Sequence, residues 1–174
     1  ESLNLAIEIK DGRIKFNPDM PEITNANAKV IDRAKNNAVA VEIFTKSELN
    51  EIGLVEKVNA IQPDLIVLAG FLLKFPNELI AAYPDKIVNI HPALLPKYGG
   101  KGMYGMHVHN ALVENKEKES GITIHYVNEN YDEGAIIFQQ SVNIEDCNTA
   151  DEIADKIHVL EHKYFPEVIE KLLN

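Results

Sequence analysis

The stretch Lys86-Ile87-Val88-Asn89-Ile90-His91-Pro92 decides the fold, because an apolar run leads directly into polar side chains. Residues 87–90 form a short, mostly apolar run, which predicts a buried strand. Asn89 and His91 lie two positions apart, so on an extended chain both side chains point to the same side. In open α/β sheets, ligands bind at the carboxyl ends of the strands. The stretch therefore predicts an α/β sheet with a site at this edge.

The residues before this stretch alternate between strand and helix patterns. Apolar positions recur with helical spacing in 47–61, whereas 65–69 is continuously apolar, as in a strand covered on both sides. The predicted helices cover residues 2–11, 27–36, 47–61 and 76–82, and the predicted strands cover 39–44 and 65–69. Residues 13–24 show no clear period. This rhythm predicts an open, mostly parallel Rossmann-like sheet with helices on both faces.

The pattern changes after Pro92. A glycine-rich loop covers 94–102, and a helix is predicted over 106–115. Residues 122–127 and 135–142 predict a C-terminal antiparallel strand pair. Thr149 and Glu152 form a capping box that opens a long C-terminal helix, which Pro166 is expected to break or restart. No repeat or linker divides the 174 residues, so we expect a single domain.

Composition excludes several classes of partner. A hydrophobic fraction of 45% and a charged fraction of 25% are ordinary for a soluble globular protein. The formal net charge of −10 argues against nucleic acid, because neutralising phosphates requires a basic face. No apolar run approaches the roughly 20 residues that span a bilayer. The single cysteine, Cys147, excludes an internal disulfide and fits a reducing compartment, so we expect a cytoplasmic protein.

Three side chains carry the chemistry that the sequence predicts. Asn89 can donate an amide N–H to a developing oxyanion, and His91 can donate or shuttle a proton. Asp132 follows in a polar loop next to a glycine, and pairing with His91 would raise the pKa of that imidazole. An isolated Asn-x-His would be read as a histidine that caps a turn before Pro92. The Asp132 loop favours the catalytic interpretation.

Other residues admit two interpretations. His107 and His109 could share a metal ion, but no cysteine accompanies them, and a polar cleft lining is favoured over a metal site. His125 could either orient the Asp132 loop or be a core histidine with its hydrogen bonds satisfied, and the sequence favours neither. Residues 71–76 are unusually apolar for a loop, which fits either core packing or the wall of a pocket for a flat aromatic ligand.

Five stretches match the pattern of a known family. They are Leu68-Ala69-Gly70-Phe71, Asn89-Ile90-His91-Pro92-Ala93-Leu94-Leu95-Pro96-Lys97-Tyr98, Gly102-Met103-Tyr104-Gly105-Met106-His107-Val108-His109, Glu119-Ser120-Gly121-Ile122-Thr123-Ile124-His125 and Asp132-Glu133-Gly134. In these stretches the chain resembles the folate-dependent glycinamide ribonucleotide formyltransferases of purine synthesis, from about residue 27 to the C-terminus. The resemblance implies the formyltransferase fold and formyl transfer from 10-formyltetrahydrofolate to the amine of glycinamide ribonucleotide, with no metal.

The resemblance also implies roles by position. His91 would be the catalytic acid, Asn89 would assist the tetrahedral oxyanion, and Asp132 would tune His91 and relay protons. Glu161 would contact the nucleotide substrate. The loop 128–132 would close a folate pterin pocket formed by Leu72, Leu73, Lys74 and Phe75 together with Asn89.

The start of the sequence departs from the family's pattern. The family begins with a strand and a Gly-Ser-Gly-Ser-Asn-like loop that holds the substrate phosphate, and a second strand precedes the position of Thr24. None of these is recognised here, so we expect residues 1–174 to form one formyltransferase domain that lacks the N-terminal strand and phosphate loop.

The alternatives are other formyl-group proteins. A formyltetrahydrofolate deformylase and a non-catalytic folate-binding relative stay open. The charge of −10 and the short chain oppose a transferase that acts on methionyl-tRNA. The expected partners are therefore folate and glycinamide ribonucleotide, without nucleic acid or membrane, and a homodimer is left open.

Overall fold

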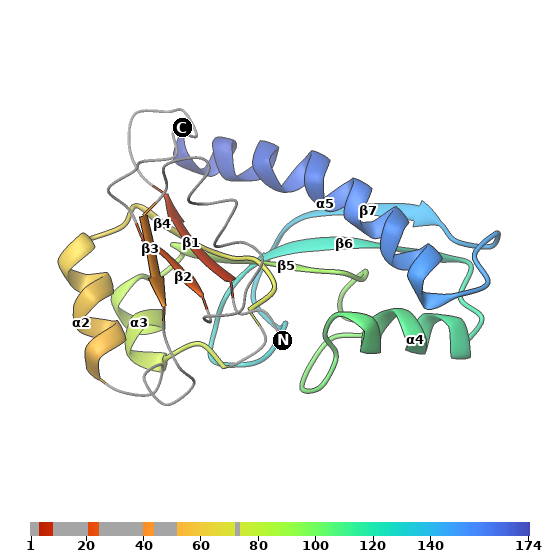
Figure 1. The fold of residues 1–174 in the computed structure, drawn as a ribbon, viewed down its shortest axis with the longest axis horizontal. Coiled ribbons are helices and arrows are strands. Elements are labelled where there is room, and N and C mark those ends of the chain that lie inside the picture. Colours follow the sequence, from red (N-terminus) through yellow and green to blue (C-terminus); the bar gives the residue numbers. More distant parts are fainter. Residues whose placement is uncertain (1–3, 9–20, 25–39, 44–51, 72–73) are drawn as a thin grey trace. The chain divides into compact units, whose positions relative to one another are not determined.

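The computed structural model describes residues 4–8, 21–24, 40–43, 52–71 and 74–174, which form two compact units (Figure 1). The first unit comprises residues 1–88 and 170–174, and the second comprises residues 89–169. The elements are β1 (Asn4–Glu8), β2 (Pro21–Thr24), β3 (Ala40–Ile43), α2 (Ile52–Ile61), β4 (Leu65–Leu68), α3 (Asn77–Ala82), β5 (Ile87–His91), α4 (Met106–Glu114), β6 (Glu119–Tyr126), β7 (Ile136–Asn143) and α5 (Ala150–Leu173).

The first unit contains a mixed sheet in the order β3-β2-β1-β4. β2 runs parallel to β3, whereas β1 runs antiparallel to both β2 and β4. All four residues of β4 are buried, as the continuously apolar run predicts, and Leu54, Val58 and Leu79 of the neighbouring helices are buried as well. The chain leaves this unit along β5, which carries it into the second unit.

Two predictions for the start of the chain are wrong. Residues 4–8 form β1 rather than part of a helix over 2–11, because four of them pair with β4, from Leu5 opposite Leu68 to Glu8 opposite Leu65. The strand before Asn25, which the pattern did not reveal, is β2; four residues are too few to show a period. The predicted helix over 27–36 lies outside the described residues, as does the region where a phosphate loop would be sought between β1 and β2.

The second unit contains the predicted antiparallel strand pair and long helix. β6 and β7 pair from Glu119 opposite Asn143 to His125 opposite Ile136. Figure 1 shows α5 running along these strands, and the rings of Phe138 on β7 and Tyr164 on α5 lie 5.1 Å apart between centroids. The core of the unit is made of fully or almost fully buried side chains from β6, α4 and α5: Ile122, Ile124, Val108, Leu112, Ile153 and Ile157.

The capping box at the start of α5 is confirmed. The Glu152 backbone N–H donates to Thr149 Oγ1 over 3.2 Å, and the Thr149 N–H donates to Glu152 Oε2 over 3.1 Å. The predicted break at Pro166 is wrong, because α5 continues through it to Leu173. Phe165 and Val168 on either side are buried, and their packing offsets the hydrogen bond that proline cannot donate.

The fold class is therefore the predicted one, an open α/β sheet with a C-terminal antiparallel pair and a long helix. The sheet is less parallel than expected, since β1 is antiparallel to both of its neighbours. Within the described ranges, no helix is long and apolar enough to cross a membrane.

Candidate active site

The polar end of β5 holds the imidazole that the sequence singled out. His91 is the last residue of β5, and only 3% of its surface is exposed. Its Nε2–H donates to the backbone carbonyl of Tyr98 over 2.7 Å, and its Nδ1 lies 3.6 Å from Asp132 Oδ2. Both ring nitrogens thus face oxygen acceptors. A neutral imidazole has one N–H and can donate to one of these acceptors, whereas the imidazolium has two and can donate to both.

Burial dominates the protonation of His91. Removal from water lowers the pKa of His91 below its ordinary value; the Asp132 carboxylate and the Tyr98 carbonyl act in the opposite direction without reversing the shift, and His125 adds to the lowering. The prediction that Asp132 raises the pKa of His91 is confirmed for the pair, and burial, which the sequence does not show, sets the net direction. An imidazole with a lowered pKa is a stronger acid, which suits a group that donates a proton.

Asp132 is held as an anion between two imidazoles. Its Oδ2 accepts a hydrogen bond from the Gly100 N–H over 2.9 Å, and its Oδ1 lies 3.6 Å from His125 Nε2. Burial alone would raise the pKa of Asp132, but His125, His91 and the Gly100 N–H together outweigh burial and lower it. The carboxylate is therefore ionised at neutral pH, and it can stabilise a positive charge on His91.

His125 matches the core-histidine interpretation, and its Nε2 also lies next to the Asp132 loop. Its ring is buried, and Nδ1–H donates to the Tyr126 carbonyl over 2.8 Å. In the neutral ring Nε2 is then an acceptor, and the Asn89 Nδ2 amide lies 3.2 Å away as its donor. This hydrogen bond orients the Asn89 amide and leaves its second N–H available for an oxyanion.

The segment after β5 is fixed by residues that the sequence analysis did not identify. Thr123 Oγ1 donates to the Ala93 carbonyl over 2.7 Å and accepts from the Leu95 N–H over 3.0 Å. Gln139 Nε2 donates to the Leu95 carbonyl over 3.0 Å and to Thr123 Oγ1 over 2.8 Å. These bonds join the segment after β5 to β6 and β7 across long sequence separations. The only available signal was the alternation along β6, which places Thr123 and His125 on the same side of the strand.

Two backbone features shape the site. Tyr98 adopts a φ of 57°, a left-handed conformation that costs an aromatic residue on the order of 1–3 kcal/mol and persists where neighbours enforce it. Gly134 passes so close to the Tyr126 carbonyl, which also accepts from His125, that a Cβ would overlap the oxygen. Glycine is required there for close approach rather than for flexibility.

The two histidines of α4 do not share a face. His107 is exposed, whereas His109 is buried, as expected for positions two apart on a helix. Burial, and after it the charges of His158 and His91, lower the pKa of His109 to about 4, so this ring is neutral. In the part of the chain that the structure describes, no three His, Cys, Asp or Glu side chains gather as metal ligands.

The predicted substrate contacts are only partly described. Leu72 and Leu73 lie outside the described residues, and Lys74 is exposed. Phe75 is buried in the first unit, where its ring meets that of Phe71 edge to face at 5.6 Å, which matches the core-packing interpretation for this residue. Glu161 lies on α5, and burial raises the pKa of its carboxyl to about 7. The ligand contacts of all these residues stay predictions.

Comparison with known proteins identifies the family. Residues 17–169 match the formyl transferase family. The chloroplastic phosphoribosylglycinamide formyltransferase of Arabidopsis thaliana is 42% identical over 142 residues, which are 78% of this chain and 49% of that protein. The phosphoribosylglycinamide formyltransferase of Bacillus subtilis is 36% identical over 151 residues, 84% of this chain and 75% of that protein.

Solved structures agree. The crystal structure of phosphoribosylglycinamide formyltransferase from Bacillus halodurans superposes with a TM-score of 0.77 at 36% identity, covering 87% of this chain and 79% of that one. The chain spans about half the length of the plant relatives it matches. The match to the family model, over residues 17–169, covers β5, the Asp132 loop and most of α5. The chain belongs to the formyl transferase family.

Proposed function

We propose that the protein transfers a formyl group from 10-formyltetrahydrofolate to the amine of glycinamide ribonucleotide, in purine biosynthesis. The observation that carries the proposal is the convergence of Asn89, His91 and Asp132, which offers an amide donor, an imidazole and a carboxylate within one unit. The relatives named as phosphoribosylglycinamide formyltransferases support the choice of substrate.

The reaction makes two opposite charges that this arrangement can serve. The substrate amine attacks the formyl carbon, whose oxygen becomes anionic while the nitrogen becomes cationic. Asn89 donates its free amide N–H to the oxyanion, and protonated His91 adds positive charge beside it. The tetrahedral intermediate then breaks its bond to the folate nitrogen, which takes up a proton from His91. The amine loses one proton, which Asp132 can relay to the ring of His91, so His91 regains the proton that it gave to the folate nitrogen and the protons balance.

Substrate contacts complete the proposal. By the resemblance to the family, residues 72–75 and Asn89 would each contact the folate pterin, and the loop 128–132 would contribute as well. Glu161 would contact the nucleotide, and its pKa of about 7 means that substrate binding near neutral pH can decide whether the carboxyl is ionised. The low cysteine content and net charge of −10 favour a reducing compartment such as the cytoplasm and small-molecule partners.

A single assay separates this proposal from its rivals. The protein is incubated with 10-formyltetrahydrofolate, with and without glycinamide ribonucleotide, while deformylated folate and formylated amine are measured. Formylated amine that appears only with both substrates supports the transferase. Folate turnover without the amine would favour a deformylase, and folate binding without turnover would favour a non-catalytic relative.

A further inference from the structure

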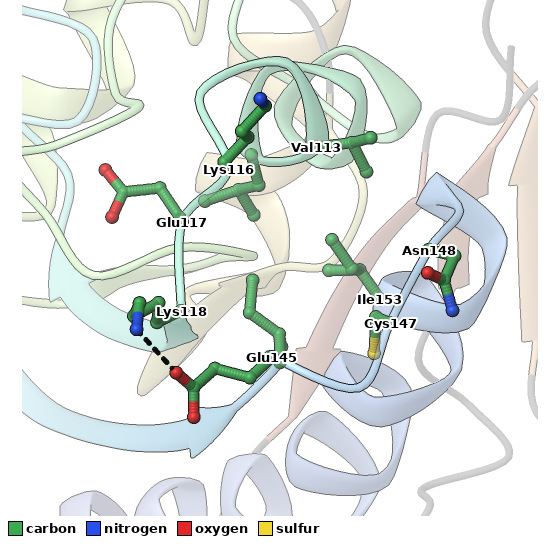
Figure 2. Close-up of a pocket in the computed structure, with 10 residues that line it drawn as sticks. Val113, Lys116, Glu117, Lys118, Glu145, Cys147, Asn148 and Ile153 are labelled. Carbon is green, nitrogen blue, oxygen red and sulfur yellow. Dashed lines mark ion pairs between the residues drawn. The ribbon is translucent and has the colours of Figure 1, made fainter.

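Glu117 lies outside the residues used in the mechanism. It follows α4 and lines a pocket of about 370 Å³ formed by the end of α4, the residues between α4 and β6, the segment between β7 and α5 and the first turn of α5. Figure 2 shows its carboxylate turned away from the other lining side chains. The same figure shows Glu145 paired with its neighbour Lys118. Lys118 Nζ lies 2.8 Å from Glu145 Oε1. Two carboxylates of one pocket thus have different partners.

The main partner of Glu117 is the hydroxyl group of Tyr98. The Tyr98 Oη–H donates to Glu117 Oε1 over 2.9 Å, and Lys97 Nζ lies 3.5 Å from the same oxygen. Lys97 is highly exposed, so its ion pair adds little. Burial and the Glu117 carboxylate both raise the pKa of Tyr98, which keeps the phenol protonated and able to donate.

Tyr98 connects Glu117 to the imidazole. Its side chain is held by Glu117, and its backbone carbonyl accepts the Nε2–H of His91 over 2.7 Å. The left-handed φ of 57° is not a conformation that a tyrosine adopts without support. Two residues on, the Gly100 N–H holds Asp132. A segment under backbone strain therefore orients both partners of the catalytic pair, and the hydrogen bond to Glu117 anchors its side chain to the residues that follow α4.

We propose that Glu117 is a positioning residue, which holds Tyr98 so that the Tyr98 carbonyl keeps the His91 imidazole oriented for proton transfer. The inference rests on the proposed formyl transfer. Glu117 has no contact with a reacting atom, so its removal should disturb the geometry of the chemical step rather than substrate binding. Small misplacements of a catalytic group lower turnover strongly, which gives the effect a measurable size.

The test compares four variants with the wild type in steady-state formyl transfer. Glu117→Ala should lower kcat about tenfold with both KM values within about twofold, and Tyr98→Phe should do the same. Glu117→Gln should recover most of the turnover, because the amide oxygen still accepts from the phenol. Adding Glu117→Ala to Tyr98→Phe should cost nothing more. Glu145→Ala, which removes the other carboxylate of the pocket, should match the wild type.

Three results would overturn the inference. The first is an unchanged kcat in Glu117→Ala. The second is a double variant whose kcat falls below that of Tyr98→Phe by the same factor as Glu117→Ala lowers the wild-type kcat. The third is a Glu117→Gln variant whose kcat is as low as that of Glu117→Ala. Should Glu117→Ala fail to fold, Tyr98→Phe and Glu117→Gln carry the same comparison.

A readout independent of turnover separates this inference from the proposed function. Nitrogen NMR of His91 reports which ring nitrogen carries the proton. The wild type should show the Nε2–H form, and Tyr98→Phe should show a mixture of both tautomers. A wild type that shows this form but transfers no formyl group would refute the proposed function alone. An unchanged tautomer in Tyr98→Phe would refute the role of Glu117.

Discussion

Replacing Glu161 by glutamine should stabilise the protein, and increasingly so as the pH rises. Glu161 is mostly buried on α5, and burial raises the pKa of its carboxyl from the ordinary 4.5 to about 7. A carboxyl with a raised pKa binds a proton more tightly in the folded than in the unfolded protein. Its contribution therefore favours folding most below pH 4.5 and is lost as the pH rises through 7. Glutamine occupies the same volume without this penalty.

The magnitude follows from the shift. At about 1.36 kcal/mol per pKa unit, a change from 4.5 to about 7 corresponds to roughly 3 kcal/mol of lost stability when the carboxyl is fully ionised. Relative to the wild type, Glu161→Gln should gain almost nothing at pH 4.5 and up to about 3 kcal/mol at pH 8. If Glu161 contacts the nucleotide, the same variant should raise the KM for glycinamide ribonucleotide. Glu161 would then lower the stability of the folded protein while strengthening the binding of glycinamide ribonucleotide.

Urea unfolding at pH 4.5, 6 and 8 measures this difference in the free energy of unfolding. Glu167→Gln is the matched control, because Glu167 lies on the same helix and is exposed. Its difference from the wild type should stay near zero at every pH. A difference for Glu161→Gln that is constant across this range, or that favours the wild type at pH 8, would refute the reasoning from burial.

Three further predictions concern the site. His91→Ala should lower turnover about 100-fold or more in a folded protein, as measured by kcat and circular dichroism, and near-normal turnover would remove His91 from the mechanism. Asp132→Asn removes the charge that raises the pKa of His91, so the limb of the rate profile on which His91 loses its proton should move to lower pH; an unmoved limb would exclude this coupling. Gly134→Ala should reduce the free energy of unfolding by about 2 kcal/mol or more, through overlap with the Tyr126 carbonyl, and unchanged urea unfolding would contradict that close approach.

The site shows which kind of information the sequence carries. β5 and its polar end were predictable, because an apolar run with Asn89 and His91 at alternate positions shows both the strand and the shared side. The pairing of Asp132 with His91 crosses about forty residues, and the resemblance to a family made it predictable. The Tyr98 carbonyl was missed because any residue supplies a carbonyl, so no side-chain pattern reveals it.

The errors have physical causes as well. The sequence predicts a helix where β1 lies because five residues carry almost no periodicity, and pairing with β4 decides their conformation. The net lowering of the pKa of His91 is not predictable from the sequence, because burial is a property of the folded chain, whereas charge pairs can be inferred from residue types. Pro166 failed to end α5 for the same reason, since buried neighbours hold the helix on both sides.

The most direct test of the central claim is a single-turnover reaction that measures both products. Enzyme in excess is mixed with 10-formyltetrahydrofolate and glycinamide ribonucleotide, and the formylated amine and the deformylated folate are quantified over time. The proposed role of Asn89, His91 and Asp132 predicts that the two products form at equal rates, and that both slow together in His91→Ala. Deformylated folate that appears without formylated amine, or equal rates in the wild type and His91→Ala, would contradict it.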